Sequence, residues 1–281
     1  MKYSNANSFK AKIKNIAKEK GIPAQQIQQN YLIEQVLHLI ASSKYRSNFI
    51  VKGGYLISNI IGIDKRTTMD LDVTLKNVKL SEENLLKIFN EILIDNNELD
   101  GFMFEVDSLS PIRRDDEYGG FEVKINAVFD TLREVVFIDV TIGDKVTPQE
   151  IKYSVKTIFS ENEINILSYN IETILAEKLE SVISRGEGST RPRDRYDLYT
   201  ILKLNYDDID FNLLKSALVN TATKRGTLEE IENYRVQVKN IIESEYQIQL
   251  WLNYQRSFRY ASEISFKESV DVVLEIMEKI N

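Results

Sequence analysis

Two aspartates separated by one apolar residue are the most informative spacing in this chain of 281 residues, where Asp70 and Asp72 flank Leu71. Residues two apart in a strand share a face and lie ~6.6 Å apart. Both carboxylates would then point to one side, while Met69, Leu71 and Val73 point into a core. Two anions on one surface repel each other, and a divalent cation such as Mg²⁺ or Mn²⁺ would offset the repulsion and take phosphate oxygens. The spacing therefore indicates a metal site that handles phosphates.

A glycine pair, Gly53 and Gly54, precedes these aspartates and opens an apolar segment that we expect to be helical. Glycines let backbone N–H groups approach a ligand closely, and the N-terminus of a helix attracts anions. We interpret this turn as a phosphate cradle placed just upstream of the predicted metal-binding strand.

A third acid, Asp139, interrupts an apolar strand pattern. By parity it shares a face with Phe137 and Thr141, opposite Ile138 and Val140. A carboxylate inside such a strand lowers stability unless it is paired, metal-bound or at an exposed end. We interpret Asp139 as a third carboxylate that converges on the metal, with a solvated sheet face as the alternative.

A second group of polar residues lies in the C-terminal half. Lys178 is seven residues after Ile171 in a predicted helix over 168–184, so it lies on the core-facing stripe. A lysine there is best explained by a polar cleft between domains in which a phosphate neutralises it. Asp194 follows Pro192 in the first turn of the next helix, where the helix dipole favours an acid. It either serves the helix alone or points into the same cleft.

Hydrophobic periodicity assigns these residues to an α+β protein, with a mixed sheet flanked by helices over residues 1–165 and a helical domain over 166–281. In the first part we expect helices at 6–20, 23–42 and 81–94, and strands around 49–51, 70–73, 102–106, 121–125 and 136–142. We expect the segment 150–166 to cross over to the helical part, which continues with helices at 207–221, 227–258 and 266–279.

Composition excludes several classes of function. The chain has no cysteine, which rules out disulfides and thiolate chemistry. Its net charge of −7 argues against bulk binding of nucleic acid, but not against a local basic patch. Neither a signal peptide nor a membrane-spanning stretch is evident, so we expect a cytoplasmic protein. Aromatic residues in the C-terminal helices, among them Trp251 and Tyr254, could stack on RNA, although such residues more often form a core.

The first motif resembles that of the AbiEii/AbiGii-type nucleotidyltransferase toxins, which share the fold of DNA polymerase β-like nucleotidyltransferases. The residues that match are Lys52, Gly53, Gly54, Arg66, Thr68, Asp70, Leu71 and Asp72. The later motifs of the family match at Lys178, Arg193, Asp194, Asp197 and Leu198. One position departs from the pattern: Tyr55 replaces a small hydroxyl residue that contacts phosphate, and Ser58 lies one helical turn further on.

The resemblance implies a toxin of a toxin–antitoxin or abortive-infection system that defends against phage and is neutralised by a cognate antitoxin. It would transfer a nucleotide from an NTP (GTP or CTP) to an RNA acceptor such as tRNA. The implied catalytic residues are Asp70, Asp72, Asp139, Lys178 and Asp194, the first three of which would hold Mg²⁺ or Mn²⁺. The implied nucleotide-binding residues are Gly53, Gly54, Tyr55, Ser58 and Lys178, while Asp197 would fix helix packing.

Two other functions remain open at this point. Three acids and a lysine also suit a metal-dependent nuclease, although a nuclease has no need of the triphosphate cradle at Gly53 and Gly54. A non-catalytic nucleotide-binding module on the same fold is the other alternative, and Tyr55 is the residue that favours it.

Overall fold

The computed structural model describes residues 3–94, 98–112, 119–160 and 162–281. The chain folds into two compact units. Unit 1 consists of Met1–Asp144 and Ile151–Ser168, and unit 2 consists of Lys145–Glu150 and Tyr169–Asn281. The predicted domain boundary, between 165 and 166, falls inside the last strand of unit 1.

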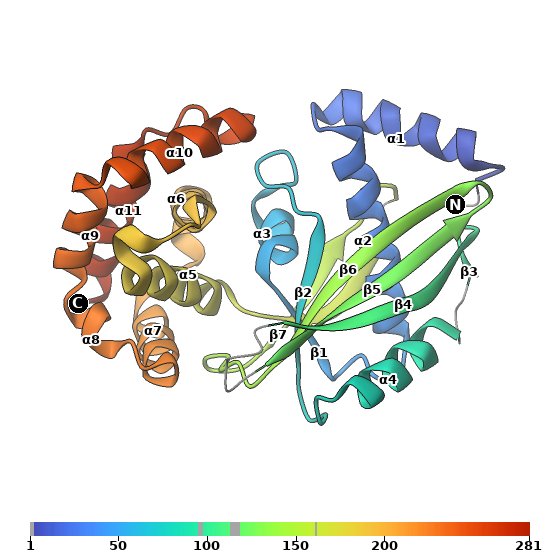
Figure 1. The fold of residues 1–281 in the computed structure, drawn as a ribbon, viewed down its shortest axis with the longest axis horizontal. Helices are drawn as coiled ribbons and strands as arrows, with labels where there is room; N and C mark the ends of the chain where they lie inside the picture. The colour runs from blue at the N-terminus through green and yellow to red at the C-terminus, as the bar shows by residue number, and fades with distance from the viewer. Residues whose placement is uncertain (1–2, 95–97, 113–118, 161) are drawn as a thin grey trace. The chain divides into compact units, whose positions relative to one another are not determined.

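Unit 1 is built on a mixed sheet (Figure 1). In the described residues its strands are β1 (Phe49–Lys52), β2 (Asp70–Leu75), β3 (Glu98–Leu99), β4 (Phe102–Ile112), β5 (Gly120–Phe129), β6 (Leu132–Ile142), β7 (Ile151–Lys156) and β8 (Glu163–Ser168). Their order across the sheet is β3-β4-β5-β6-β2-β1-β8-β7. β2 runs parallel to β6, β1 runs parallel to β8, and the other neighbours are antiparallel. Two strands far apart in sequence, β2 and β6, are thereby joined at the centre.

The helices of unit 1 are α1 (Ala6–Lys20), α2 (Ala24–Ser42), α3 (Gly53–Ile61) and α4 (Glu82–Ile94). In α1 and α4 the buried residues are apolar and recur at helical spacing. α2 is buried around most of its circumference, with Gln29, Asn30 and Glu34 among its buried residues. Phe9 of α1 packs on Tyr31 of α2 and on Phe102 of β4, with ring centroids 5.2 and 5.1 Å apart. The predicted combination of a helix-flanked mixed sheet with a helical C-terminal part is confirmed.

One predicted segment was wrong. The structure forms strands β7 and β8 in the region 150–166, where the sequence analysis expected a crossover. β7 lies at the edge of the sheet, and Val155 is its one buried residue. An edge strand with a single buried position carries too little apolar alternation to be recognised from sequence.

Unit 2 is helical throughout its longer segment. Its α-helices are α5 (Ile171–Arg185), α6 (Pro192–Asn205), α7 (Phe211–Arg225), α8 (Leu228–Glu232), α9 (Tyr234–Glu243), α10 (Glu245–Ser257) and α11 (Phe266–Ile280). The single helix predicted at 227–258 was wrong, because the chain breaks at Asn233 and at Ser244, whose side chain caps α10. Trp251 and Tyr254 are buried in a core cluster with Tyr196, so these aromatic residues form core.

None of the helices in the described parts of the chain combines the length and the apolarity needed to span a bilayer.

A buried acid in unit 1 makes its stability depend on pH. Glu34 of α2 is 2% exposed and accepts a hydrogen bond of 3.0 Å from the Ile158 N–H. Burial raises the pKa of Glu34 from 4.5 to about 8, and the bond from Ile158 opposes this only in part. The folded state therefore binds more protons than the unfolded chain between these two values, and stability falls as pH rises through that window.

We expect Glu34→Gln to be more stable than the wild type at about pH 8.5, by on the order of 4–5 kcal/mol, and equal to it near pH 4. The amide stays neutral and still accepts the hydrogen bond from Ile158. Urea unfolding at several pH values measures the difference, with exposed Glu105→Gln as the control. A Glu34→Gln gain that does not change with pH would contradict this assignment.

Candidate active site

Strand β2 lies between β1 and β6 in the sheet (Figure 1). This position brings charged residues of neighbouring strands into register. Asp72 is in register with Lys52 of β1 on one side and with Asp139 of β6 on the other. Asp139 is in turn in register with Glu122 of β5. Residues in register on neighbouring strands lie about 5 Å apart and point to the same side. We call this side of the sheet the carboxylate face. Asp70, two residues before Asp72 on β2, lies on the same face.

Burial distinguishes this face from the opposite one. Leu71 and Val73 of β2 and Ile138 and Val140 of β6 are fully buried, while the aspartates between them are partly exposed. The parity predicted for Asp139 is therefore confirmed.

The predicted burial of Met69 was wrong, because its side chain is 40% exposed. Met69 precedes the first residue of β2, and its carbonyl accepts a hydrogen bond of 2.8 Å from the Gln29 side chain. It does not take part in the strand, so strand alternation does not set the direction of its side chain.

The carboxylate of Asp72 lies directly against the glycine turn. Its Oδ2 accepts a hydrogen bond of 3.2 Å from the Gly54 N–H, at the N-terminus of α3. Gly53 has φ +66°, and a Cβ at this position would overlap the Asp72 carboxylate. A Cβ at Gly54 would lie 2.9 Å from Thr68 Oγ1 and 3.0 Å from Arg66 Nη2. Neighbouring side chains therefore approach both positions too closely for any residue but glycine. The positive N-terminal end of α3 attracts one anion, the carboxylate of Asp72.

Asp70 has a separate partner, because Thr68 Oγ1 donates to its Oδ1 at 2.5 Å. With the side chains in these orientations, no three histidine, aspartate or glutamate residues in the described part of the chain are grouped so as to hold a metal ion. The backbone register brings Asp70, Asp72 and Asp139 to one face, and their convergence on a cation stays a prediction.

The side chains of Tyr55 and Ser58 lie inside unit 1, at 0% and 2% exposure. Burial raises the pKa of Tyr55 well above its usual value, so its hydroxyl stays neutral. Ser58 donates to the Tyr55 carbonyl at 2.7 Å. The predicted phosphate contacts through these two side chains are therefore not supported, since the interior has no access to a nucleotide at the turn.

Lys52 has partners that the sequence analysis did not predict. Its Nζ donates to Thr141 Oγ1 at 2.6 Å and forms an ion pair with Asp144. Thr74 and Thr141 also donate to Asp144, at 2.7 and 3.0 Å. Burial alone would raise the pKa of Asp144, but Lys52 and these hydrogen bonds outweigh it and lower the pKa. Asp144 lies beyond the end of β6, where strand alternation gives no signal.

Glu122 was also missed, although it lies between Phe121 and Val123 in a strand that was predicted. Its parity indicates that it shares a side with Lys124, but only the pairing of β5 with β6 shows that this side carries Asp139.

Unit 2 holds the second group of predicted residues. Lys178 Nζ of α5 lies 2.6 Å from Asp194 Oδ1 and 2.8 Å from Asp197 Oδ2, both of α6. The side chains are 13%, 4% and 0% exposed in that order. Ser181 donates to Asp194 at 3.3 Å, and Arg191 lies 3.3 Å from the same carboxylate.

These contacts explain both the charge and the position of Asp194. Burial alone would raise the pKa of Asp194, but the attraction of Lys178 and Arg191 and the hydrogen bonds from Lys178 and Ser181 lower it. Asp194 and Asp197 are thus the groups that neutralise Lys178, where the sequence analysis expected a phosphate, and they pair α5 with α6. The three aspartates of the carboxylate face belong to the other unit, and their predicted meeting with Lys178 stays a prediction.

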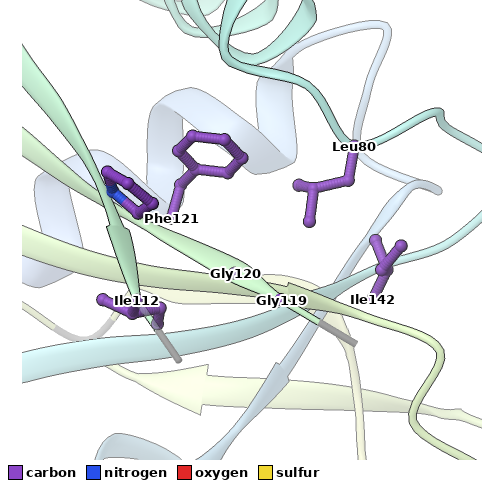
Figure 2. A pocket seen from close by; sticks show the side chains of 7 residues that line it. Leu80, Ile112, Gly119, Gly120, Phe121 and Ile142 are labelled. Atoms are coloured by element: carbon purple, nitrogen blue, oxygen red, sulfur yellow. The ribbon is translucent and has the colours of Figure 1, made fainter. Parts of the chain in front are cut away.

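An apolar pocket of about 410 Å³ lies elsewhere in unit 1 (Figure 2). Leu80, Phe121 and Ile142 contribute to its lining, and none of the lining residues that the structure describes is charged. Phe121 lies on the core side of β5, opposite Glu122, so this pocket is separate from the carboxylate face.

Comparisons with known proteins agree with the motifs. A family model described as nucleotidyl transferase AbiEii toxin, type IV TA system, matches residues 36–275. No curated protein sequence matches the chain significantly.

The solved structures that are similar to this chain include three proteins. One is an H. pylori protein described as a candidate nucleotidyltransferase, with 16% identity over 92% of this chain and 97% of that chain, at a TM-score of 0.49. Another is JHP933 from Helicobacter pylori, with 15% identity over 91% and 93% of the two chains and a TM-score of 0.47. The third is an antigenic nucleotidyltransferase-like protein from Paracoccidioides brasiliensis, with 18% identity over 70% and 90% and a TM-score of 0.43.

The family model covers most of the chain, including the glycine turn, the aspartates of β2 and β6, and the lysine–aspartate cluster of unit 2. The chain therefore belongs to the AbiEii nucleotidyltransferase toxin family of type IV toxin–antitoxin systems.

Proposed function

We propose that this toxin transfers a nucleotide from an NTP to a hydroxyl of an RNA, with Asp70, Asp72 and Asp139 at the centre of its site. One observation carries the proposal: Asp72 is in register with Asp139 and also accepts the Gly54 N–H at the start of α3. A place for an anion and a pair of neighbouring carboxylates are thus adjacent, as a reaction of a nucleoside triphosphate requires.

The residues fit a divalent cation. Three carboxylates on one face are hard oxygen ligands, and Mg²⁺ or Mn²⁺ accepts them together with water and phosphate oxygens. The close packing of Gly53 on Asp72 holds one of these ligands in place. When bound, the cation would neutralise charge that develops on the transferring phosphoryl group.

The chain's own residues supply the remaining parts. The first amides of α3 bind the phosphates, and Lys52, held by Asp144, keeps β1 and its glycine turn beside β2. The acceptor oxygen bonds to the α-phosphorus, the bond to the bridging oxygen breaks, and pyrophosphate leaves with the electron pair. The Asp139 carboxylate accepts the proton of the hydroxyl.

The finer assignments follow the family resemblance. We propose GTP or CTP as the donor, tRNA as the acceptor, and the cytoplasm as the site of action. Membership of a type IV system implies a cognate antitoxin. Lys178 and Asp194 would take part in nucleotide binding and activity.

Asp72→Asn keeps the shape of the side chain but removes its charge, and we expect nucleotide transfer to fall by roughly 100-fold or more. Incorporation of each labelled NTP into total RNA with Mg²⁺ measures it, and exposed Asp64→Asn is the matched control. Equal incorporation by the Asp72→Asn variant and the wild type would exclude the assignment. RNA shortening without any NTP would instead indicate a nuclease.

Gly53→Ala tests the close approach between the turn and Asp72. Gly53 and Gly21 have nearly the same φ, +66° and +67°, but a Cβ at Gly21 meets nothing within 4 Å. Both alanines introduce backbone strain of roughly 1–2 kcal/mol, measurable by urea unfolding. We expect Gly53→Ala alone to reduce transfer, by at least about tenfold. Equal activity of the two variants would show that the turn does not position Asp72.

Lys178→Met should destabilise the protein by about 3–5 kcal/mol, because two buried carboxylates lose their cation. In the wild type the pKa of Asp194 is lower in the folded state than in the unfolded chain, which stabilises the fold at pH values above the unfolded-state pKa. This stabilisation is lost as the pH falls through the folded-state pKa. In the variant, burial raises the pKa of Asp194. The difference in free energy of unfolding between Lys178→Met and the wild type should therefore become smaller as the pH is lowered, which urea unfolding measures.

The variant Lys178→Met with Asp194→Asn and Asp197→Asn separates folding from function. Its cluster is neutral, so we expect stability to return while transfer stays low. Transfer at the wild-type rate would limit the cluster to a structural role.

A further inference from the structure

Phe137 presents an aromatic ring on the carboxylate face. Its side chain is 36% exposed, two residues before Asp139 on the same side of β6. It is in register with Asp70 on β2 and with Lys124 on β5. A ring in the middle of a central strand is thus flanked by a carboxylate and an ammonium group.

This environment suits a nucleotide. Exposed aromatic rings on a sheet surface stack on bases of single-stranded RNA, and every base has a face for such contact. Lys124 adds a positive charge beside the ring, although it is shared with Asp107 at 2.9 Å. An aliphatic ligand would gain from the ring but would offer no polar group to Asp70 or Lys124.

The order of the strands indicates which reactant reaches the ring. α3 follows directly from β1 and its first amides reach Asp72 of β2, whereas Phe137 lies on β6, on the other side of β2 from β1. Phosphates held at α3 place the leaving pyrophosphate on the β1 side. In an in-line displacement the attacking oxygen enters from the opposite side, which is the side of β6.

We infer that the ring of Phe137 stacks on the base of the acceptor nucleotide whose hydroxyl attacks, and that it sets the affinity for the RNA and not for the NTP. This inference rests on the proposed transfer reaction. It makes Phe137 a substrate-binding residue beside the carboxylates and leaves their chemistry unchanged.

Phe137→Leu keeps an apolar side chain but removes the ring. We expect KM for bulk tRNA, used as the acceptor, to rise by roughly 5- to 100-fold, with KM for the NTP within about twofold of the wild type. Phe137→Trp should retain tight binding of tRNA. Tyr246→Leu is the matched control, because Tyr246 is also exposed (52%) but lies in unit 2.

A binding measurement needs no turnover. The chain has a single tryptophan, Trp251, which is fully buried, so Phe137→Trp adds one exposed fluorophore. We expect bulk tRNA to quench it and to protect it from acrylamide, and the NTP alone to leave it unchanged. Tyr246→Trp, the control fluorophore, should respond to neither.

The outcomes separate this inference from the proposed function. Normal transfer by the wild type with an unchanged KM for tRNA in Phe137→Leu would overturn the role of Phe137 and leave the reaction intact. A rise in KM for the NTP alone would overturn it too, because the ring would then serve the donor. Should the wild type transfer nothing to RNA, selective quenching by tRNA would still support the contact, and its absence would overturn it.

Discussion

The placement of like charges on neighbouring strands is the constraint on which the rest of unit 1 depends. Asp72 and Asp139 occupy paired positions in β2 and β6. Two carboxylates about 5 Å apart near a protein surface repel each other by about 3 kcal/mol at an effective dielectric constant of ~20. The fold tolerates this because Asp72 accepts a backbone N–H at a helix N-terminus, and because its neighbour in register on β1 is the cationic residue Lys52. A cation bound between the two carboxylates would offset their repulsion and so stabilise this arrangement.

The glycine turn connects that charge arrangement to the backbone. Gly53 takes a left-handed conformation and carries no Cβ, which lets the Asp72 carboxylate reach the first amides of α3. Tyr55, the departure from the family pattern, turns its ring into the interior instead of into the turn. The bulky side chain of Tyr55 therefore does not fill the glycine turn.

In unit 2 the electrostatic feature is the buried charge of Lys178. Lys178 lies on the buried stripe of α5, where an isolated charge would be costly. Asp194 and Asp197 approach it from α6 and satisfy that charge from two sides. The ion pairs that join the two helices also hold Lys178 and Asp194 in fixed positions.

The spacing of residues along the sequence by itself determined which side chains share a face within one element. Strand parity placed Asp70 with Asp72 and Asp139 opposite Ile138, and helical spacing put Lys178 on a buried stripe, because both depend only on the repeat of one element. Strand pairing, in contrast, joins segments remote in sequence. The tertiary structure alone decided that Asp72 faces Asp139, that Glu122 extends the row, and that Asp144 binds Lys52. It also decided where the side chains of Tyr55 and Met69 point, because Tyr55 lies in the first turn of α3, whose buried side depends on what packs against it, and Met69 lies outside β2.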